Sequence, residues 1–416
     1  MRRLTLAVVL AGCLSEPPRP HGDGPPIAAG SVLRAELAVG DLDGDGYDDI
    51  VAWGNESMRG QNPTLFVYWG GEQLENPDVR VYLTIDDPSA SGTPVWFEVL
   101  TASISISSDG DRGVVVLTGQ DTAPESRPVN PPRLVYTMYV PAGHQSLGAP
   151  TRSSARAEEI GGYTDLPAPV VALAHDPVQP PPLRELVAGD DTPWVFAGPP
   201  TSSSVGSATG YWDLDQFEMP HFMQHVFVLP PEGPSEDLLL ITGGRAYRVV
   251  GTGPMFEMAD GGVALAGSPN SNRTVRGAQL ANHFYAVATD QFMAGQLAIV
   301  DVPPGADPVS YGMVVQSSIT PTDATIGDAD GNSTVDVVTI EGQALSVYED
   351  LGLDPTMSTF KLVSPRMSVG DYDLIAVGNF QGDARREIYV LSSTNPSEPP
   401  MCFRVDGNAL DPCNDE

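Results

Sequence analysis

The chain has 416 residues, and 54 acidic against 21 basic side chains give it a formal net charge of −33. A surface this acidic repels nucleic acid and anionic lipid headgroups, which excludes nucleic acid as a partner. The length exceeds that of a single hydrophobic core. The 43 Gly and 40 Pro favour turn-rich β-structure, built as several domains or as one repetitive ring or solenoid.

The N-terminus has a short charged and apolar segment. A basic start is followed by apolar residues 4–10 and by Leu-Ala-Gly-Cys at 10–13, which resembles the lipobox that ends the signal of an exported bacterial lipoprotein. We expect removal of residues 1–12 and lipidation of Cys13, which would anchor the chain in the envelope, at the outer membrane or cell surface. The apolar stretch is too short to span a membrane, and the alternative is a cytosolic N-terminus that happens to be apolar. The Pro-rich residues 13–30 are expected to form an extended tether, which leaves 31–416 for the folded part.

Residues 41–49 form an acidic loop, Asp-Leu-Asp-Gly-Asp-Gly-Tyr-Asp-Asp, after a short apolar strand. Alternate side chains of a tight loop converge on one point, and Gly46 permits the sharp turn. The oxygen ligands at positions 1, 3, 5, 7 and 9 are Asp41, Asp43, Asp45, the Tyr47 carbonyl and Asp49. Such a set favours a hard cation, Ca²⁺ above all.

Two other interpretations of this loop are weaker. An EF-hand requires a bidentate Glu at position 12 and flanking helices, but position 12 is Ala52, in the apolar run 50–53 that is typical of a strand. A plain acidic turn would bring four Asp together within nine residues. Their mutual repulsion favours a neutralising cation.

The same spacing returns near residue 330, where Ser333 replaces the Gly at position 6. The predicted ligands there are Asp328, Asp330, Asn332, the Thr334 carbonyl and Asp336. We therefore predict one or two calcium ions per chain.

The strand–loop–strand units at 41–51 and 327–338 resemble the FG-GAP repeats of integrin α-subunit β-propellers and the related bacterial VCBS-type repeats. The resemblance implies a propeller with its calcium loops at one end and its ligand contacts in loops at the other end.

A polar, acidic or Gly residue followed by an apolar run recurs at intervals of 40 to 72 residues. The runs begin after Asp49, Gly113, Glu185, Asp237, Gln296, Asp336 and Glu387. Units of this size with three or four short strands are typical of propeller blades, because a blade buries both faces only against its neighbours. We predict an all-β fold, a seven-bladed β-propeller with blades at approximately 35–85, 98–165, 168–220, 221–268, 273–315, 322–364 and 371–413. A pair of β-sandwiches or a smaller propeller is the alternative.

The other five loops lack the full metal pattern. In the seventh repeat the equivalent positions are Asn379, Gln381, Asp383 and Glu387, with two arginines between them, which argues against a tight site. Three long segments, 119–133, 143–165 and 198–220, are expected to interrupt the middle repeats, either as solvated loops or as a ligand-contact surface.

The sequence contains no recognisable catalytic motif. Its six histidines lie outside metalloprotease signatures, and phosphate-binding and dinucleotide-binding loops are missing. His221 and His225 would share one face of a strand, either as partly buried histidines or as a zinc pair. An enzyme with residues scattered around the central channel remains an alternative.

Cys402 and Cys413 are the cysteines left free once Cys13 is lipidated. An oxidising compartment and the turn sequence at 406–408 predict a disulfide between them.

The lipobox, the acidic loops and the repeats together predict a monomeric, calcium-stabilised, surface-exposed lipoprotein of adhesion type that binds a protein or glycan without catalysis. The alternatives are an exported enzyme, for instance one acting on polysaccharide, and a structural envelope component.

Overall fold

The structure is a computed structural model of the chain. It describes residues 37–55, 63–71, 74, 79–82, 99–109, 112–121, 133–141, 143, 145–148, 151–155, 170–173, 185–188, 194–196, 208–211, 223–230, 237–242, 244–251, 256–258, 262–265, 272–290, 295–315, 319, 321–350, 360–363, 365–381, 386–393 and 398–413. The predicted signal peptide, Cys13 and the tether lie outside these residues.

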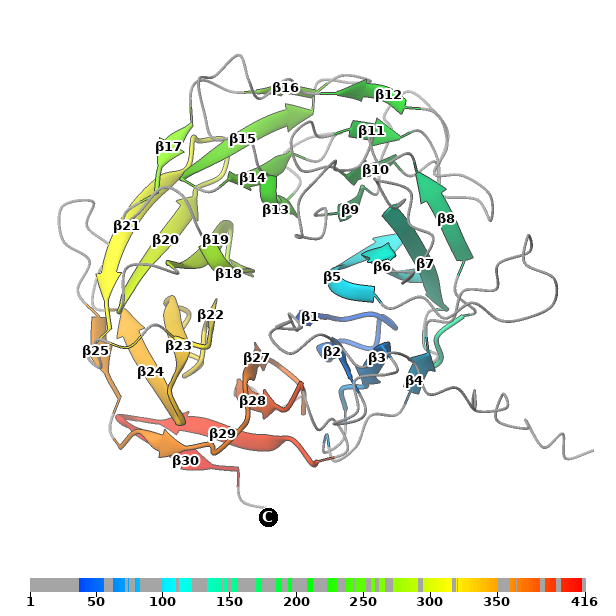
Figure 1. The fold of residues 1–416 in the computed structure, drawn as a ribbon. Helices are drawn as coiled ribbons and strands as arrows, with labels where there is room; N and C mark the ends of the chain where they lie inside the picture. Colours follow the sequence, from blue (N-terminus) through cyan, green and yellow to red (C-terminus); the bar gives the residue numbers. More distant parts are fainter. Residues whose placement is uncertain are drawn as a thin grey trace, which may run out of the picture.

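Seven antiparallel sheets are arranged in a ring (Figure 1), and in each sheet the main strands are hydrogen-bonded in chain order. Sheets 1 to 3 contain β1 (Leu37–Gly40), β2 (Asp49–Asn55), β3 (Pro63–Tyr68) and β4 (Val79–Tyr82); β5 (Val99–Asp109), β6 (Arg112–Asp121), β7 (Arg133–Pro141) and β8 (Thr151–Ala155); and β9 (Val170–Leu173), β10 (Glu185–Ala188), β11 (Trp194–Phe196) and β12 (Ala208–Tyr211).

Sheets 4 and 5 contain β13 (Met223–Val228), β14 (Leu238–Thr242), β15 (Arg245–Gly251), β16 (Phe256–Met258) and β17 (Val263–Ala264); and β18 (Asn272–Leu280), β19 (His283–Asp290), β20 (Gln296–Val302) and β21 (Val309–Val314). Sheets 6 and 7 contain β22 (Asp323–Gly327), β23 (Asp336–Glu341), β24 (Ala344–Asp350), β25 (Phe360–Leu362) and β26 (Met367–Ser368); and β27 (Leu374–Gly378), β28 (Glu387–Leu391), β29 (Met401–Asp406) and β30 (Ala409–Pro412). Five sheets thus have four strands, and β17 and β26 give the other two a fifth.

The first strand of every sheet lies nearest the axis of the ring (Figure 1). Each of these strands contacts the first strand of the next sheet, and β27 contacts β1, which closes the ring. Six of them, β1, β5, β13, β18, β22 and β27, line a cavity of about 520 Å³. No helix in the described part of the chain is long and apolar enough to cross a membrane.

The core lies between adjacent sheets, which explains the recurring apolar runs. On β2, Ile50 packs against sheet 7 beside Ala376, while its neighbour Val51 packs against sheet 2 beside Val115. Because successive strand residues point to opposite faces and both faces are covered, every position of the run is apolar. Burying one such side chain contributes about 1.5 to 3 kcal/mol.

The all-β propeller expected from the sequence is confirmed. Two of the three segments expected to interrupt the middle repeats require correction, because they contain strands: β8 lies within 143–165 and β12 within 198–220. Both are outer strands with polar or small residues, such as Thr-Arg-Ser-Ser-Ala in β8, so they lack the apolar signal of the inner strands. Most of the remaining residues of the three segments lie outside the described part.

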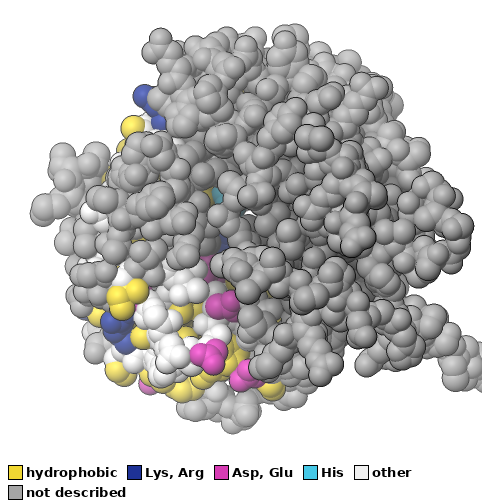
Figure 2. Space-filling model, in the orientation of Figure 1, with side chains coloured by type: hydrophobic (Ala, Val, Ile, Leu, Met, Phe, Trp, Pro, Cys, Tyr) yellow, Lys and Arg dark blue, Asp and Glu magenta, His cyan; other side chains and the backbone are white. Residues whose placement is uncertain are grey.

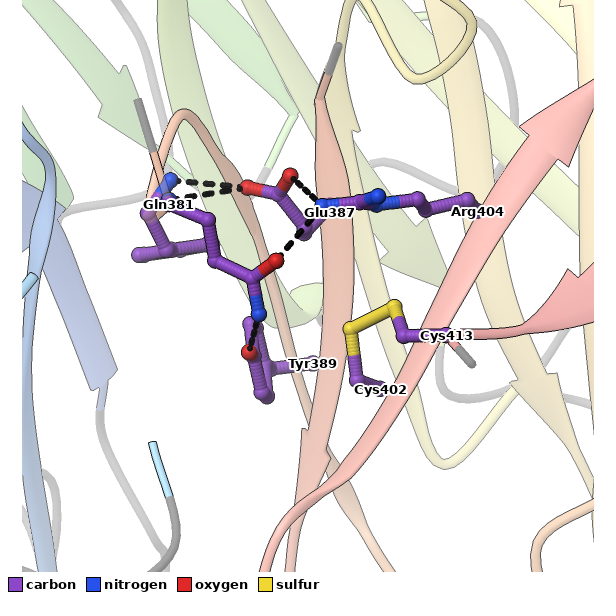
Figure 3. A network of polar contacts seen from close by, with 7 residues as sticks. Gln381, Glu387, Tyr389, Cys402, Arg404 and Cys413 are labelled. Atoms are coloured by element: carbon purple, nitrogen blue, oxygen red, sulfur yellow. Dashed lines mark hydrogen bonds and ion pairs between the residues drawn. A yellow bond between two sulfur atoms is a disulfide. The ribbon is translucent and has the colours of Figure 1, made fainter. Parts of the chain in front are cut away.

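Cys402 on β29 and Cys413, just after β30, form a disulfide with a Cα–Cα distance of 5.2 Å (Figure 3). The Cys413 N–H also donates to the Cys402 carbonyl at 2.9 Å. The bond therefore fixes the end of the last described strand to the strand beside it.

Replacing both cysteines by alanine is expected to lower the free energy of unfolding by about 3 kcal/mol, because the unfolded chain gains the entropy of an open loop of about 12 residues. Denaturant unfolding of the double variant measures the loss. Adding reductant should destabilise the parent protein by a similar amount and the variant not at all.

Candidate metal centre

The acidic loop at 41–49 connects β1 to β2, whose pairing places Gly40 opposite Asp49. The carboxylates of Asp41, Asp43 and Asp49 each offer an oxygen within 4.8 Å of the others. Asp41 organises the loop by accepting the Gly44 N–H at 2.8 Å and the Gly46 N–H at 3.0 Å. Three of the five predicted ligands are thus brought together by local hydrogen bonds.

Asp45 and Tyr47 are placed differently from the other three. Asp45 lies outside the group of converging carboxylates and is exposed, and its carboxylate accepts the Tyr47 N–H at 2.9 Å. The Tyr47 side chain lies against Gly70 and Gly71, where a Cβ on Gly70 would come within 2.6 Å of the tyrosine Cβ. Tyr47 therefore packs the base of the loop.

Asp49 is the buried anchor of the loop, with 1% of its surface exposed. Its two carboxylate oxygens accept the Leu42 N–H at 2.7 Å and the Gly70 N–H at 2.8 Å. Burial raises the pKa of Asp49 to about 7, because removal from water disfavours the charged form more than the two N–H groups favour it.

The loop at 328–336, between β22 and β23, repeats two of these contacts at equivalent positions. Ser333 donates its N–H to Asp328 at 3.0 Å, as Gly46 does to Asp41, and Ala329 donates to Asp336 at 2.7 Å, as Leu42 does to Asp49. The converging carboxylates are those of Asp328, Asp330 and Asp336.

The two remaining ligands predicted for this loop interact with each other. The Asn332 side chain donates to Asp330 at 2.7 Å and accepts the Thr334 N–H at 2.6 Å. Asn332 and Thr334 are exposed. They repeat the arrangement of Asp45 and Tyr47.

Two buried carboxylate oxygens in this second loop have no hydrogen-bond partner among the described residues, Oδ1 of Asp328 and Oδ1 of Asp336. Asp336 is fully buried, and burial raises its pKa to about 8. A buried carboxylate oxygen without a partner is costly unless a cation neutralises it. The residues present therefore fit a metal ion, for which Asp328, Asp330 and Asp336 would supply carboxylate oxygen ligands.

Ser333 has a positive φ of 68°, in the place where Gly46 has 93°. A side chain is strained in this conformation, whereas Gly adopts it freely. We expect Ser333→Gly to raise the free energy of unfolding by about 1 kcal/mol. The reciprocal change, Gly46→Ser, should lower it by a similar amount, and denaturant unfolding of both variants decides whether backbone strain is the cause.

In sheet 7 an arginine takes the place of a loop cation (Figure 3). Glu387, at the position of Asp49 and Asp336, accepts the Phe380 N–H at 2.9 Å as its counterparts do. Its other oxygen accepts a hydrogen bond from Nη2 of Arg404 on β29 at 2.8 Å, and the same guanidinium binds Gln381. The Arg404 guanidinium occupies the place beside Glu387 that a cation would take, which agrees with the expectation that this loop is not a tight metal site. Asp383 lies outside the described residues.

Sheet 4 also has an arginine on its third strand that binds an acidic residue at the start of its second strand. Asp237, just before β14, accepts from Nε of Arg248 on β15 at 3.0 Å and from its Nη2 at 2.5 Å. Neither arginine was expected from the sequence. Their signal is a single Arg within an apolar stretch of the third strand, at 246–250 and 401–405.

The zinc-pair alternative involves His221, which lies outside the described residues. His225 lies on β13, as a strand histidine, and stacks on Phe227 with ring centroids 6.2 Å apart. The other described histidine, His283, pairs with Asp301, and its Nδ1 lies 2.8 Å from Oδ1 of Asp301.

Acidic side chains are visible on the ring over the region where Figure 1 places β22–β30 (Figure 2). The fold and the two acidic loops define the class of the molecule, a β-propeller with two candidate cation-binding loops.

Residues 34–60, which include the first acidic loop, match the FG-GAP repeat family. The chain is therefore a β-propeller with an FG-GAP repeat at its first acidic loop. No curated protein sequence matches it.

Several solved structures are similar in fold. A putative 6-phosphogluconolactonase from Bacteroides uniformis has 10% identity and a TM-score of 0.48, over 88% of this chain and 95% of that one. The periplasmic gluconolactonase of Pseudomonas aeruginosa has 9% identity and a TM-score of 0.48 over the same shares. The SapL1 lectin, solved with α-methyl fucoside, has 8% identity and a TM-score of 0.43, over 79% and 95%. At these values none of them indicates a function.

Proposed function

We propose that this protein is a calcium-stabilised, non-catalytic binding propeller of the bacterial cell surface, tethered by lipid on Cys13. The observation that carries the calcium part is the pair of buried, unpartnered oxygens on Asp328 and Asp336. Asp41, Asp43 and Asp49 would hold one ion, and Asp328, Asp330 and Asp336 the other. The ion supplies positive charge that lets these carboxylates stay ionised where they are buried.

The role of the metal is structural in this proposal. Both loops connect the first two strands of a sheet, so repulsion among their carboxylates acts directly on that connection. With an ion bound, the same carboxylates would hold the two strands together. The scaffold then presents its outer loops to a protein or glycan.

The export part rests on the lipobox at 10–13. The test is labelling of cells with a fatty-acid analogue, followed by fractionation. Label and protein in the membrane fraction of the parent, and loss of both in Cys13→Ser, support it. An unlabelled, soluble parent protein would overturn it.

The binding part is tested with the soluble form that begins after Cys13, screened against glycan and surface-protein arrays with calcium and with chelator. Binding that requires calcium, without turnover on a panel of polysaccharides, is the expected result. Turnover of any substrate in the panel would replace the binding function by an enzymatic one.

A further inference from the structure

The first acidic loop lies at the point where the last sheet meets the first. Sheets 1 and 7 are the first and last described sheets along the chain, and they lie side by side (Figure 1). No linker between consecutive sheets spans this seam, so side-chain and main-chain contacts must join it. Apolar side chains such as Ile50 and Ala376 pack across the seam, and its polar contacts centre on Asp48, the residue before the predicted ligand Asp49.

Asp48 exchanges hydrogen bonds with Asn379 of sheet 7. Its N–H donates to the Asn379 carbonyl at 2.9 Å, and its Oδ2 accepts the Asn379 N–H at 2.7 Å. The same oxygen lies 3.2 Å from Nη1 of Arg386. Gly378 permits this approach, because a Cβ there would come within 2.8 Å of Asp48 Oδ2.

Two other contacts extend the joint. Across the seam, the Gly71 N–H donates to the Phe380 carbonyl at 2.7 Å. On the opposite side of the loop, the Gly143 N–H of sheet 2 donates to the Asp43 carbonyl at 2.5 Å. The loop at 41–49 therefore contacts both neighbouring sheets.

We propose that calcium at the first loop controls closure of the ring: the ion fixes the backbone of 41–49, and the loop then presents Asp48 to Asn379 and Arg386 as a clasp between sheets 1 and 7. This inference rests on the proposed calcium site. Asp48 is not a ligand, because its carboxylate is used across the seam. The second loop, at 328–336, has no such role at this seam.

The test is hydrogen exchange of the folded chain, measured by mass spectrometry on peptides that span Gly71. The Gly71 amide donates its hydrogen bond to Phe380 across the seam, and the Asp48 side chain takes no part in this bond. If calcium binds only the closed ring, a calcium concentration ten times the dissociation constant lowers the population of the open ring about tenfold. Exchange of the Gly71 amide should slow by the same factor. The Val315 amide, bonded to Gly295 within sheet 5 at 2.7 Å, is the internal control and should not respond.

Three variants separate the possibilities. In Asp330→Ala, which removes the second site, calcium should still slow exchange at Gly71. In Asp43→Ala, or in Asp43→Asn if the first does not fold, calcium should no longer do so. In Asp48→Ala, or in Asp48→Asn if the alanine variant does not fold, two ions should still bind. The Gly71 amide should nevertheless exchange fast in the presence of calcium.

Protection of Gly71 that survives in the Asp48 variants, or that calcium still induces in the Asp43 variants, would overturn the clasp. A parent protein that binds no calcium would instead refute the proposed function. Calcium counts and exchange rates on the same samples distinguish the two failures.

Discussion

Arg404→Met is expected to lower the free energy of unfolding by about 3 to 5 kcal/mol, the cost of leaving a buried charge without its partner. Glu387 has a side chain that is 0% exposed, and Arg404 Nη2 is 2.8 Å from it. Without the guanidinium, Glu387 must either stay ionised in the protein interior or take up a proton. Chemical denaturation measures the loss.

The matched control is Lys361→Met, which removes the Lys361–Glu349 pair of sheet 6. The Lys361 side chain is 44% exposed, so water can replace it beside Glu349 and this change should cost less than Arg404→Met. Adding Glu387→Leu to Arg404→Met should recover most of the stability, since an apolar pair can replace a buried ion pair. Equal effects of Arg404→Met and Lys361→Met would show that the guanidinium does not neutralise a buried charge.

In the presence of chelator, the free energy of unfolding is expected to fall as the pH rises from about 4 to 8. Asp49 and Asp336 have folded-state pKa values of about 7 and about 8, above the ordinary 3.8, so between these values the folded state holds protons that the unfolded state has lost. Each group then lowers the free energy of unfolding by up to about 1.4 kcal/mol per pH unit.

Calcium should remove most of this slope, because the ion favours the ionised carboxylates. At neutral pH and ten times the dissociation constant it should also add about 1.4 kcal/mol per site. Asp336→Asn isolates one contribution, since it should flatten part of the slope in chelator. Stability in chelator that does not change over this pH range would contradict the buried-carboxylate account.

The sequence predicted the propeller and the two acidic loops because these depend on local pattern. The run after Asp49 faces two neighbouring sheets at once, so all of its residues are apolar, and the Asp spacing follows from a single tight turn. Asp328 and Asp336 were identified for the same reason. The disulfide expected between Cys402 and Cys413 joins neighbouring strands in the structure.

The features that sequence analysis missed depend on register and on contacts between distant segments. Arg404 meets Glu387 only when β28 and β29 are paired, and β8 and β12 have too few apolar residues to be recognised. Asp48 stands at a loop position with no ligand role. Its partner Asn379 is 331 residues away, and only closure of the ring brings the two together.

The most direct measurement is the number of calcium ions bound by chelator-stripped protein in an equilibrium titration. We predict two ions per chain, one in Asp43→Ala, one in Asp330→Ala, none in the double variant, and still two in Asp383→Ala. No binding by the parent protein, or two ions bound by the double variant, would contradict the assignment of the sites to these two loops.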